Sequence, residues 1–465
     1  MAVEIPATHL DVAADSADAA SASQPWPKRS VAWFAAWVFA IALCFAQLEA
    51  SIMQLLVIPI EHDFNLNDTQ VGLLGGLAPV LFYAVLAVPL SRFVDMWPRN
   101  LLMTFGVAAA TIMTALSGLA QNFWQLFATR VGVGIGGIFN GPGTYSMMSD
   151  FFPREKLPRA IAVLQIGFIG GTGIALIAGG AIIQLVNHLP IYTVPGIGVI
   201  HHWQLVLLGV SLPGFFIAAL VRSIPEPARR GRMSQKGASA LPLTGVLSYL
   251  WQHRAIYAPQ FLALAFSVIE FGGTRFWQAT FFIRTYGWTQ AHAGYLLGIS
   301  SLIAGPIGLC FGTWLTEHFV RKGDTAANLR VVAITYSISP IFTIATPLMP
   351  NPWLAVISTS IGGAFAFGGA VPQNAALQSV TPNEMRGQVT ALYLFVFAVI
   401  GTGFGPNFIS LITNYIIGNQ DLIRFALAGS AAVVTPIAAW FMWQGVKPYG
   451  EAIRQLKERE AKGLA

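Results

Sequence analysis

Long apolar stretches alternate with short polar breaks along almost the whole chain. Several of these stretches exceed the about 18 apolar residues that a helix needs to cross a bilayer. Pro and Gly fall inside some of them, which membrane helices tolerate because neighbouring helices satisfy the freed backbone groups. The pattern predicts twelve membrane-spanning helices, at residues 33–58, 70–90, 101–119, 123–147, 159–186, 203–222, 256–283, 291–315, 328–348, 352–379, 387–413 and 421–445.

The polar breaks also predict the domain organisation. Residues 1–29 are rich in Ala, Asp and Ser, so we expect a disordered tail without the features of a cleavable signal peptide. The longest central break, 223–254, is predicted to link an N-terminal six-helix bundle (30–222) to a C-terminal six-helix bundle (255–446). Residues 447–465 then form a C-terminal tail.

Composition places the chain among all-α integral membrane proteins. It is 55% hydrophobic and 10% charged, whereas soluble domains carry about 25% charged residues. The basic residues lie in short loops, so the positive net charge indicates membrane topology rather than nucleic-acid binding. Cys44 and Cys310 both lie in apolar stretches and show no disulfide or metal-ligand spacing, so we expect neither a metal nor a cofactor.

Loop charges predict the orientation. The even-numbered loops and both tails hold most of the Lys and Arg, while the odd-numbered loops hold essentially Arg284 and Arg424. Cytoplasmic loops carry the excess of basic residues, so both termini are expected in the cytoplasm, for a protein of a bacterial inner (plasma) membrane.

Two features repeat at nearly the same offset in the two halves. Glu49 and Glu270 each lie within the first apolar span of a half, 221 residues apart (270 minus 49). Asp95, after the second span, and Glu317, after the eighth, are 222 apart (317 minus 95). Parallel repeats of this kind are typical of transporters whose substrate site lies between the halves.

Four ionisable residues within the spans are candidates for substrate and proton binding: Glu49, Arg130, Glu270 and Arg275. A charge in hydrocarbon costs several kcal/mol, so it is rarely present without a role. Glu49 and Arg130 lie at similar depth, roughly 14 and 10 Å from the outer ends of their spans, so they could pair. For both arginines the alternative is that the side chain reaches outward to the lipid head groups.

Several motifs resemble the spinster-like branch of the major facilitator superfamily. FNLNDTQVGLL, YSMMSDFFPREKLPRA and MRGQVTALYLFVFAVIGTGFGP carry the resemblance, which runs from about residue 31 to 450. SRFVDMWPR retains Asp95 and Arg99 of the superfamily's loop signature. The resemblance implies the two-bundle facilitator fold and secondary transport. The family's Asp-Arg pair in the first helix is Glu49-Ala50 here, which puts coupling schemes built on that pair in doubt.

Asp95, Arg99 and Glu317 are predicted to form a cytoplasmic gate that pairs with basic groups or helix N-termini of the other bundle. The alternative is a solvated loop whose charges only set topology. Two packing expectations accompany the gate. The Gly132, Gly134 and Gly137 series allows close helix packing, and Trp277, Phe281, Phe282 and Trp288 form an interfacial aromatic belt.

The leading functional hypothesis is a secondary active transporter working by alternating access. It would move a small or amphipathic, lipid-like organic solute, most simply an anion held by Arg130 or Arg275, and couple this movement to protons by symport or antiport. Protonation of Glu49 or Glu270 would remove an expensive buried charge. The alternatives are an uncoupled facilitator and, in a different class, an integral-membrane enzyme or sensor. The chain lacks the clustered polar residues an enzyme needs, so we expect no enzymatic activity, and we expect a monomer surrounded by membrane lipids.

Overall fold

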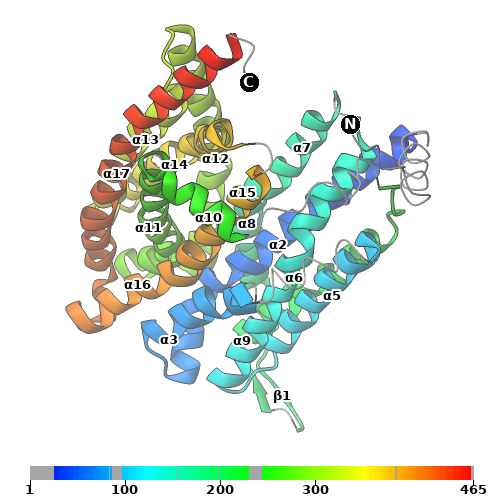
Figure 1. The fold of residues 1–465 in the computed structure, drawn as a ribbon. Helices are drawn as coiled ribbons and strands as arrows, with labels where there is room; N and C mark the ends of the chain where they lie inside the picture. Colours follow the sequence, from blue (N-terminus) through cyan, green and yellow to red (C-terminus); the bar gives the residue numbers. More distant parts are fainter. Residues whose placement is uncertain are drawn as a thin grey trace.

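The computed structural model describes residues 26–82, 84–85, 97–153, 155–196, 198–229, 243–382 and 385–461. Within these ranges the chain is almost entirely helical, and the first and last described residues lie at one end of the molecule, opposite a small β-hairpin (Figure 1). We call these two ends of the molecule the terminal end and the hairpin end.

Six spans build the N-terminal half. Asn67 starts the second of them with a capping box, in which its side chain accepts from the Gln70 amide and the Gln70 side chain accepts from the Asn67 amide. Asn122 caps the fourth span in a similar way. The elements are α2 (Arg29–Phe64), α3 (Asp68–Gly72), the π-helical segment η1 (Leu73–Leu77), α5 (Arg99–Ser117), α6 (Phe123–Phe151), α7 (Leu157–Gln165), the π-helical segment η2 (Ile166–Gly170), α8 (Gly171–Val186) and α9 (His202–Arg222).

The second half repeats this plan. A short helix, α10 (Leu243–Gln252), precedes it within the region predicted as the linker. The last helix continues well beyond the predicted end of its span at residue 445. The elements are α11 (Arg254–Tyr286), α12 (Gln290–Arg321), α13 (Ala327–Leu348), α14 (Pro352–Val380), α15 (Arg386–Val396), the π-helical segment η3 (Phe397–Phe404), α16 (Gly405–Leu411), the π-helical segment η4 (Ile412–Ile417), the 3-10 turn η5 (Gln420–Leu422) and α17 (Ile423–Ala461).

The prediction of a twelve-helix membrane protein is confirmed. Ten helices of the described chain are long and apolar enough to cross a membrane. The less apolar α6 and the second span, described only in part, complete the twelve. The one addition is the hairpin of β1 (Tyr192–Val194) and β2 (Gly198–Ile200), antiparallel strands whose connecting turn places Gly196 at a φ of 85°.

Equivalent helices pack in equivalent ways. In the first half α5 packs against α6 and α9, and in the second half α13 packs against α14 and α17. Between the halves, α8 packs on α12 through small residues: a Cβ on Gly298 would lie 2.6 Å from the carbonyl oxygen of Gly173. Such contacts let helix backbones approach closely. Gly134 is similar, since its Cβ would lie 2.1 Å from the Pro79 carbonyl oxygen, so the close packing predicted from this glycine is confirmed.

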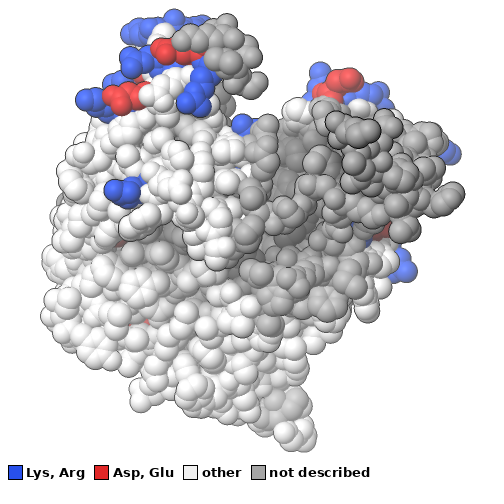
Figure 2. Space-filling view, viewed as in Figure 1, with Lys and Arg blue, Asp and Glu red and all other residues white. Residues whose placement is uncertain are grey.

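Among the described residues, only one of the three large clusters of buried apolar side chains contains residues from both halves. One cluster joins α2 and α9 to α11 and α17, through residues such as Ile52, Trp203, Trp277 and Leu427. A second cluster lies wholly in the first half and a third wholly in the second. In Figure 2 the charged side chains gather at the terminal end, in two groups that stand apart. The halves therefore meet toward the hairpin end and separate toward the terminal end.

Candidate functional site

A polar contact joins the two halves near the middle of the bundle. Arg275 of α11 donates from Nη2 to Gln47 Oε1 of α2 at 2.9 Å and to Thr172 Oγ1 of α8 at 3.0 Å. The Thr172 hydroxyl also lies 3.4 Å from Gln47 Oε1. No carboxylate of the described residues lies within the 4.0 Å of a salt bridge to Arg275. The positive charge of this partly buried guanidinium is therefore held by neutral groups alone.

Glu49 and Arg130 are buried inside the first half. Glu49 Oε1 accepts a hydrogen bond of 2.9 Å from Thr114 Oγ1 of α5. Arg130, on α6, is near enough for electrostatic attraction to Glu49, although the two groups form no salt bridge within 4.0 Å. Nε and Nη2 of Arg130 are buried and have no hydrogen-bond partner among the described residues. A buried guanidinium with free donors is costly, and it is well suited to an anionic ligand.

Glu270 occupies a comparable position in the second half. Its Oε1 accepts a hydrogen bond of 2.6 Å from Thr274 Oγ1, one turn further along α11. The Ser430 hydroxyl of α17 lies near the carboxyl group, but Oε2 is buried without a hydrogen-bond partner among the described residues. No cation of the described chain forms a salt bridge with this carboxyl group.

Helix geometry separates the carboxyl groups from the contact between the halves. At about 100° per residue, Glu49 points about 160° away from Gln47 around α2, and Glu270 about 140° away from Arg275 around α11. Each carboxyl group therefore faces the interior of its own half, toward α5 or α17, while Gln47 and Arg275 face each other. The binding roles of Glu49, Arg130, Glu270 and Arg275 stay predictions.

A charged cluster closes the hairpin end. The Arg284 guanidinium of α11 binds both oxygens of Asp68, at 2.8 and 3.1 Å, and Glu61 Oε2 of α2 at 2.6 Å. All three side chains are buried, Asp68 completely. Glu61 and Asp68 were not predicted from sequence. The signal available was Arg284 itself, one of two basic residues in loops otherwise poor in them.

At the terminal end the charges pair within each half. Arg99, at the start of α5, donates to Asp150 of α6 at 2.6 Å and to Glu226, after α9, at 2.8 Å. Glu317 pairs with Arg321 on its own helix and is largely exposed. Asp95 lies outside the described residues, so the predicted gate stays a prediction. Asp150 and Glu226, which hold Arg99, were also not identified from sequence.

The described residues contain no group of three or more His, Cys, Asp or Glu side chains that could hold a metal ion. The polar groups of the site are instead single charges and amides spread over several helices. Such an arrangement can bind and release a solute or a proton.

Two bundles of six membrane helices, with buried charges inside them and at their contact, define a membrane transporter and not an enzyme. Residues 38–406 match the Major Facilitator Superfamily, and the chain belongs to this family, within its spinster-like branch.

Known relatives and structures agree with this assignment. The chain is 25% identical over 430 residues to an MFS-type efflux pump of Mycolicibacterium smegmatis, covering 91% of this chain and 95% of that protein. It is 21% identical over 402 residues to the protein spinster of Drosophila melanogaster, covering 82% of this chain and 62% of that longer protein. The crystal structure of a bacterial homologue of the human lysosomal transporter spinster, inward-facing and unoccupied, superposes with a TM-score of 0.74 at 21% identity, over 92% of this chain and 98% of that one.

Proposed function

We propose that this transporter moves an organic anion by alternating access and couples the movement to protons. One observation carries the substrate class: Arg275 lies where the halves meet and is bonded only to the neutral side chains of Gln47 and Thr172. A carboxylate or phosphate is the natural partner of such a guanidinium. Arg130, with two unbonded donors, is the second anchor.

Glu270 is the proposed proton carrier. Its carboxyl group is buried, has one oxygen without a partner, and has no cation of the described chain in salt-bridge contact. Taking up a proton removes an uncompensated buried charge and supplies a donor. Glu49 has the electrostatic support of Arg130, so its ionised form is better compensated. The proton therefore exchanges at Glu270, while Glu49 keeps Arg130 in place.

The proposed setting is a bacterial inner membrane, with the terminal end in the cytoplasm and the protein acting as a monomer of two bundles, 30–222 and 255–446. The excess of basic residues at the terminal end supports this orientation. The contact between the halves at the hairpin end then corresponds to a transporter closed on the outside. The mycobacterial relative is named an efflux pump, so export is the direction to measure first.

The test is transport in proteoliposomes with an imposed pH gradient, using a panel of amphipathic organic acids and lysolipids. We expect accumulation that collapses when the gradient is removed. Glu270→Gln is expected to abolish gradient-driven accumulation and to leave exchange of labelled for unlabelled solute intact, because exchange needs no net proton movement.

Arg275 supplies the matched pair of variants for the substrate class. Arg275→Gln is expected to weaken anion binding. Arg275→Lys keeps the positive charge and should therefore retain part of the affinity for the anion. Accumulation that survives in Glu270→Gln but is lost in Glu49→Gln would show that Glu49, and not Glu270, is the proton carrier. Accumulation that survives in both variants would place the coupling group elsewhere, and uptake that only equilibrates the solute despite the pH gradient would identify an uncoupled facilitator. A preference for neutral or cationic solutes would contradict the substrate class.

A further inference from the structure

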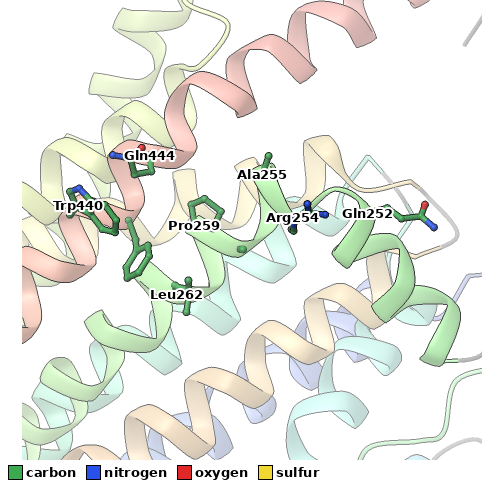
Figure 3. Close-up of a pocket in the computed structure, with 9 residues that line it drawn as sticks. Gln252, Arg254, Ala255, Pro259, Leu262, Trp440 and Gln444 are labelled. Carbon is green, nitrogen blue, oxygen red and sulfur yellow. The ribbon is translucent and has the colours of Figure 1, made fainter.

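A groove lies on the outside of the second half, at the terminal end, between α11 and α17. Its volume is about 560 Å³. Figure 3 shows the lining side chains coming from these two helices, with Pro259 between them and Gln252 contributed by the end of α10. The groove is remote from Arg275 and from the contact between the halves, so transport as proposed above does not use it.

Small residues create this groove. Ala255 and Ala258 line it on α11, and Pro259 packs on Gly445 of α17, where an added Cβ would lie 3.2 Å from the proline Cβ. A larger side chain at any of these positions would fill the space or push the helices apart. The volume falls within the about 300–1,000 Å³ of small-molecule sites.

The lining changes from polar to apolar along the helices. Gln252, Arg254 and Gln444 lie at the polar end. Leu262, two turns further along α11, and Trp440 and Phe441, one turn back along α17, lie at the apolar end. This order matches the order of a phospholipid, whose head group is polar and whose acyl chains are apolar.

Tryptophans place the groove at the membrane surface. Trp251 at the end of α10 is 72% exposed and Trp440 of α17 is 57% exposed, so both indole rings face away from the protein interior. Trp443 is also exposed, and its indole donates to Ser337. Exposed tryptophans of this kind mark the level of the lipid head groups. The polar end of the groove therefore lies among head groups and the apolar end faces acyl chains.

Arg254 gives the groove its charge. It is the single charged residue among the nine that line the groove. Its Nη1 makes a long bond of 3.4 Å to the Trp251 carbonyl oxygen, and its guanidinium lies 5.8 Å from the centre of the Trp251 ring. No carboxylate of the described residues is in salt-bridge contact with it. Most of its donors are therefore free for an anion.

We propose that this groove binds an anionic phospholipid of the leaflet at the terminal end, with the phosphate on Arg254 and Gln444 and an acyl chain along Leu262 and Trp440. Charge complementarity selects the anionic head group, and the apolar end selects a lipid over a free phosphate ester.

The test is lipid binding to the full-length purified protein, measured by native mass spectrometry during titration with phosphatidylglycerol or phosphatidylcholine. A basic residue near a membrane surface contributes about 1 kcal/mol toward anionic lipid. Arg254→Gln is therefore expected to weaken phosphatidylglycerol binding about fivefold and phosphatidylcholine binding less, because the choline ammonium offsets the charge of its phosphate. Arg321→Gln is the matched control, because this exposed arginine of the same end lies outside the groove and its charge is already paired with Glu317, so it should change neither.

A second variant tests the groove itself. Ala258→Leu fills the space without touching the charge, and it should weaken both lipids. Equal losses of phosphatidylglycerol in Arg254→Gln and Arg321→Gln would overturn the proposal, because they would indicate diffuse attraction to a basic surface. Competition by soluble glycerol phosphate as strong as by the lipid would also overturn it, since the apolar end would then contribute nothing.

Discussion

Replacing Arg284 with glutamine is expected to open the hairpin end of the transporter. In the structure this guanidinium joins α11 of the second half to Asp68 and Glu61 of the first, and it also donates to the Gln420 carbonyl oxygen at 2.9 Å. Glutamine is shorter and neutral, so it cannot replace these contacts. The two carboxylates would remain buried and face each other without a cation.

The structure sets the size of the effect. Arg284 makes three charge-assisted hydrogen bonds to carboxylates, between 2.6 and 3.1 Å. Removing one partner of a buried ion pair costs about 3–5 kcal/mol, because the charge left behind is desolvated and unpaired. Separating the halves at this end returns Asp68 and Glu61 to water and relieves that cost. The equilibrium between closed and open hairpin ends should therefore shift by about two to four orders of magnitude toward the open form.

The assay is a distance measurement by pulsed electron paramagnetic resonance. Spin labels at His188→Cys, after α8, and Leu348→Cys, at the end of α13, report the separation of the halves at the hairpin end. Cys44 and Cys310 are first replaced by alanine so that only the introduced thiols react. The labelled protein that keeps Arg284 should give a short distance between the two spin labels. Arg284→Gln should produce a second population with a longer distance.

Arg321→Gln is the matched control, because Arg321 also pairs with a carboxylate, Glu317, but does so on the surface of a single helix. Exposed pairs of this kind contribute about 0.3–0.5 kcal/mol, so the distances should not change. An unchanged short distance in Arg284→Gln, with the protein still folded, would refute the reasoning and leave the apolar core and the α8–α12 contact as the closing forces.

Three further outcomes are expected. Gly298→Leu should lower transport strongly, measured by solute uptake, because its side chain would strike the α8 backbone, and Gly209→Leu is a milder control, because a Cβ there would meet only the Ile182 side chain at 3.6 Å. Gln47→Ala should tighten anion binding a few-fold, measured by calorimetry, because it removes one of the two hydrogen bonds that compete for Arg275; weaker binding would contradict this. Asp95→Asn should lower turnover more than substrate affinity, and unchanged rates would leave that residue only a topological role.

Sequence predicted the depth of residues better than the direction in which they point. Span count, loop charge and the offset of about 222 residues were enough for the twelve-helix fold, because each depends on position along the chain. The predicted aromatic belt was wrong for Trp277, Phe281 and Phe282, which are 0–1% exposed and belong to the core shared by the halves. Trp277 also donates its indole proton to the Pro406 carbonyl oxygen. These residues lie near the expected depth, but their helix turns them inward.

The same distinction explains the polar contacts that sequence did not predict. Arg284 is separated from Asp68 by 216 residues and from Glu61 by 223, and nothing local in the chain connects them. Gln47 and Thr172 are uncharged, so placing them in an apolar span costs much less than placing a charge there. Only a costly buried charge stands out in such a span, so these two residues were not singled out from the sequence. Their importance depends on Arg275 facing them from the other half, and this is visible only when the helices are packed.

The charges divide the molecule into three levels with different consequences for movement. At the hairpin end an ion-pair cluster joins the halves, so this end opens only when buried charges separate. At the terminal end Arg99 is held by Asp150 of its own half and by Glu226 in the segment directly after α9, and such pairs stiffen the first half without joining it to the second. Between these two levels, Arg275 of the second half contacts only uncharged side chains of the first half, Gln47 and Thr172. In the proposed mechanism, an anion that binds Arg275 competes with Gln47 and Thr172 for the Nη2 donor, so binding would loosen the middle contact while the ion pairs still hold the hairpin end. Under that proposal the substrate would enter from the terminal end before the opposite end opens, which is the sequence of events that alternating access requires.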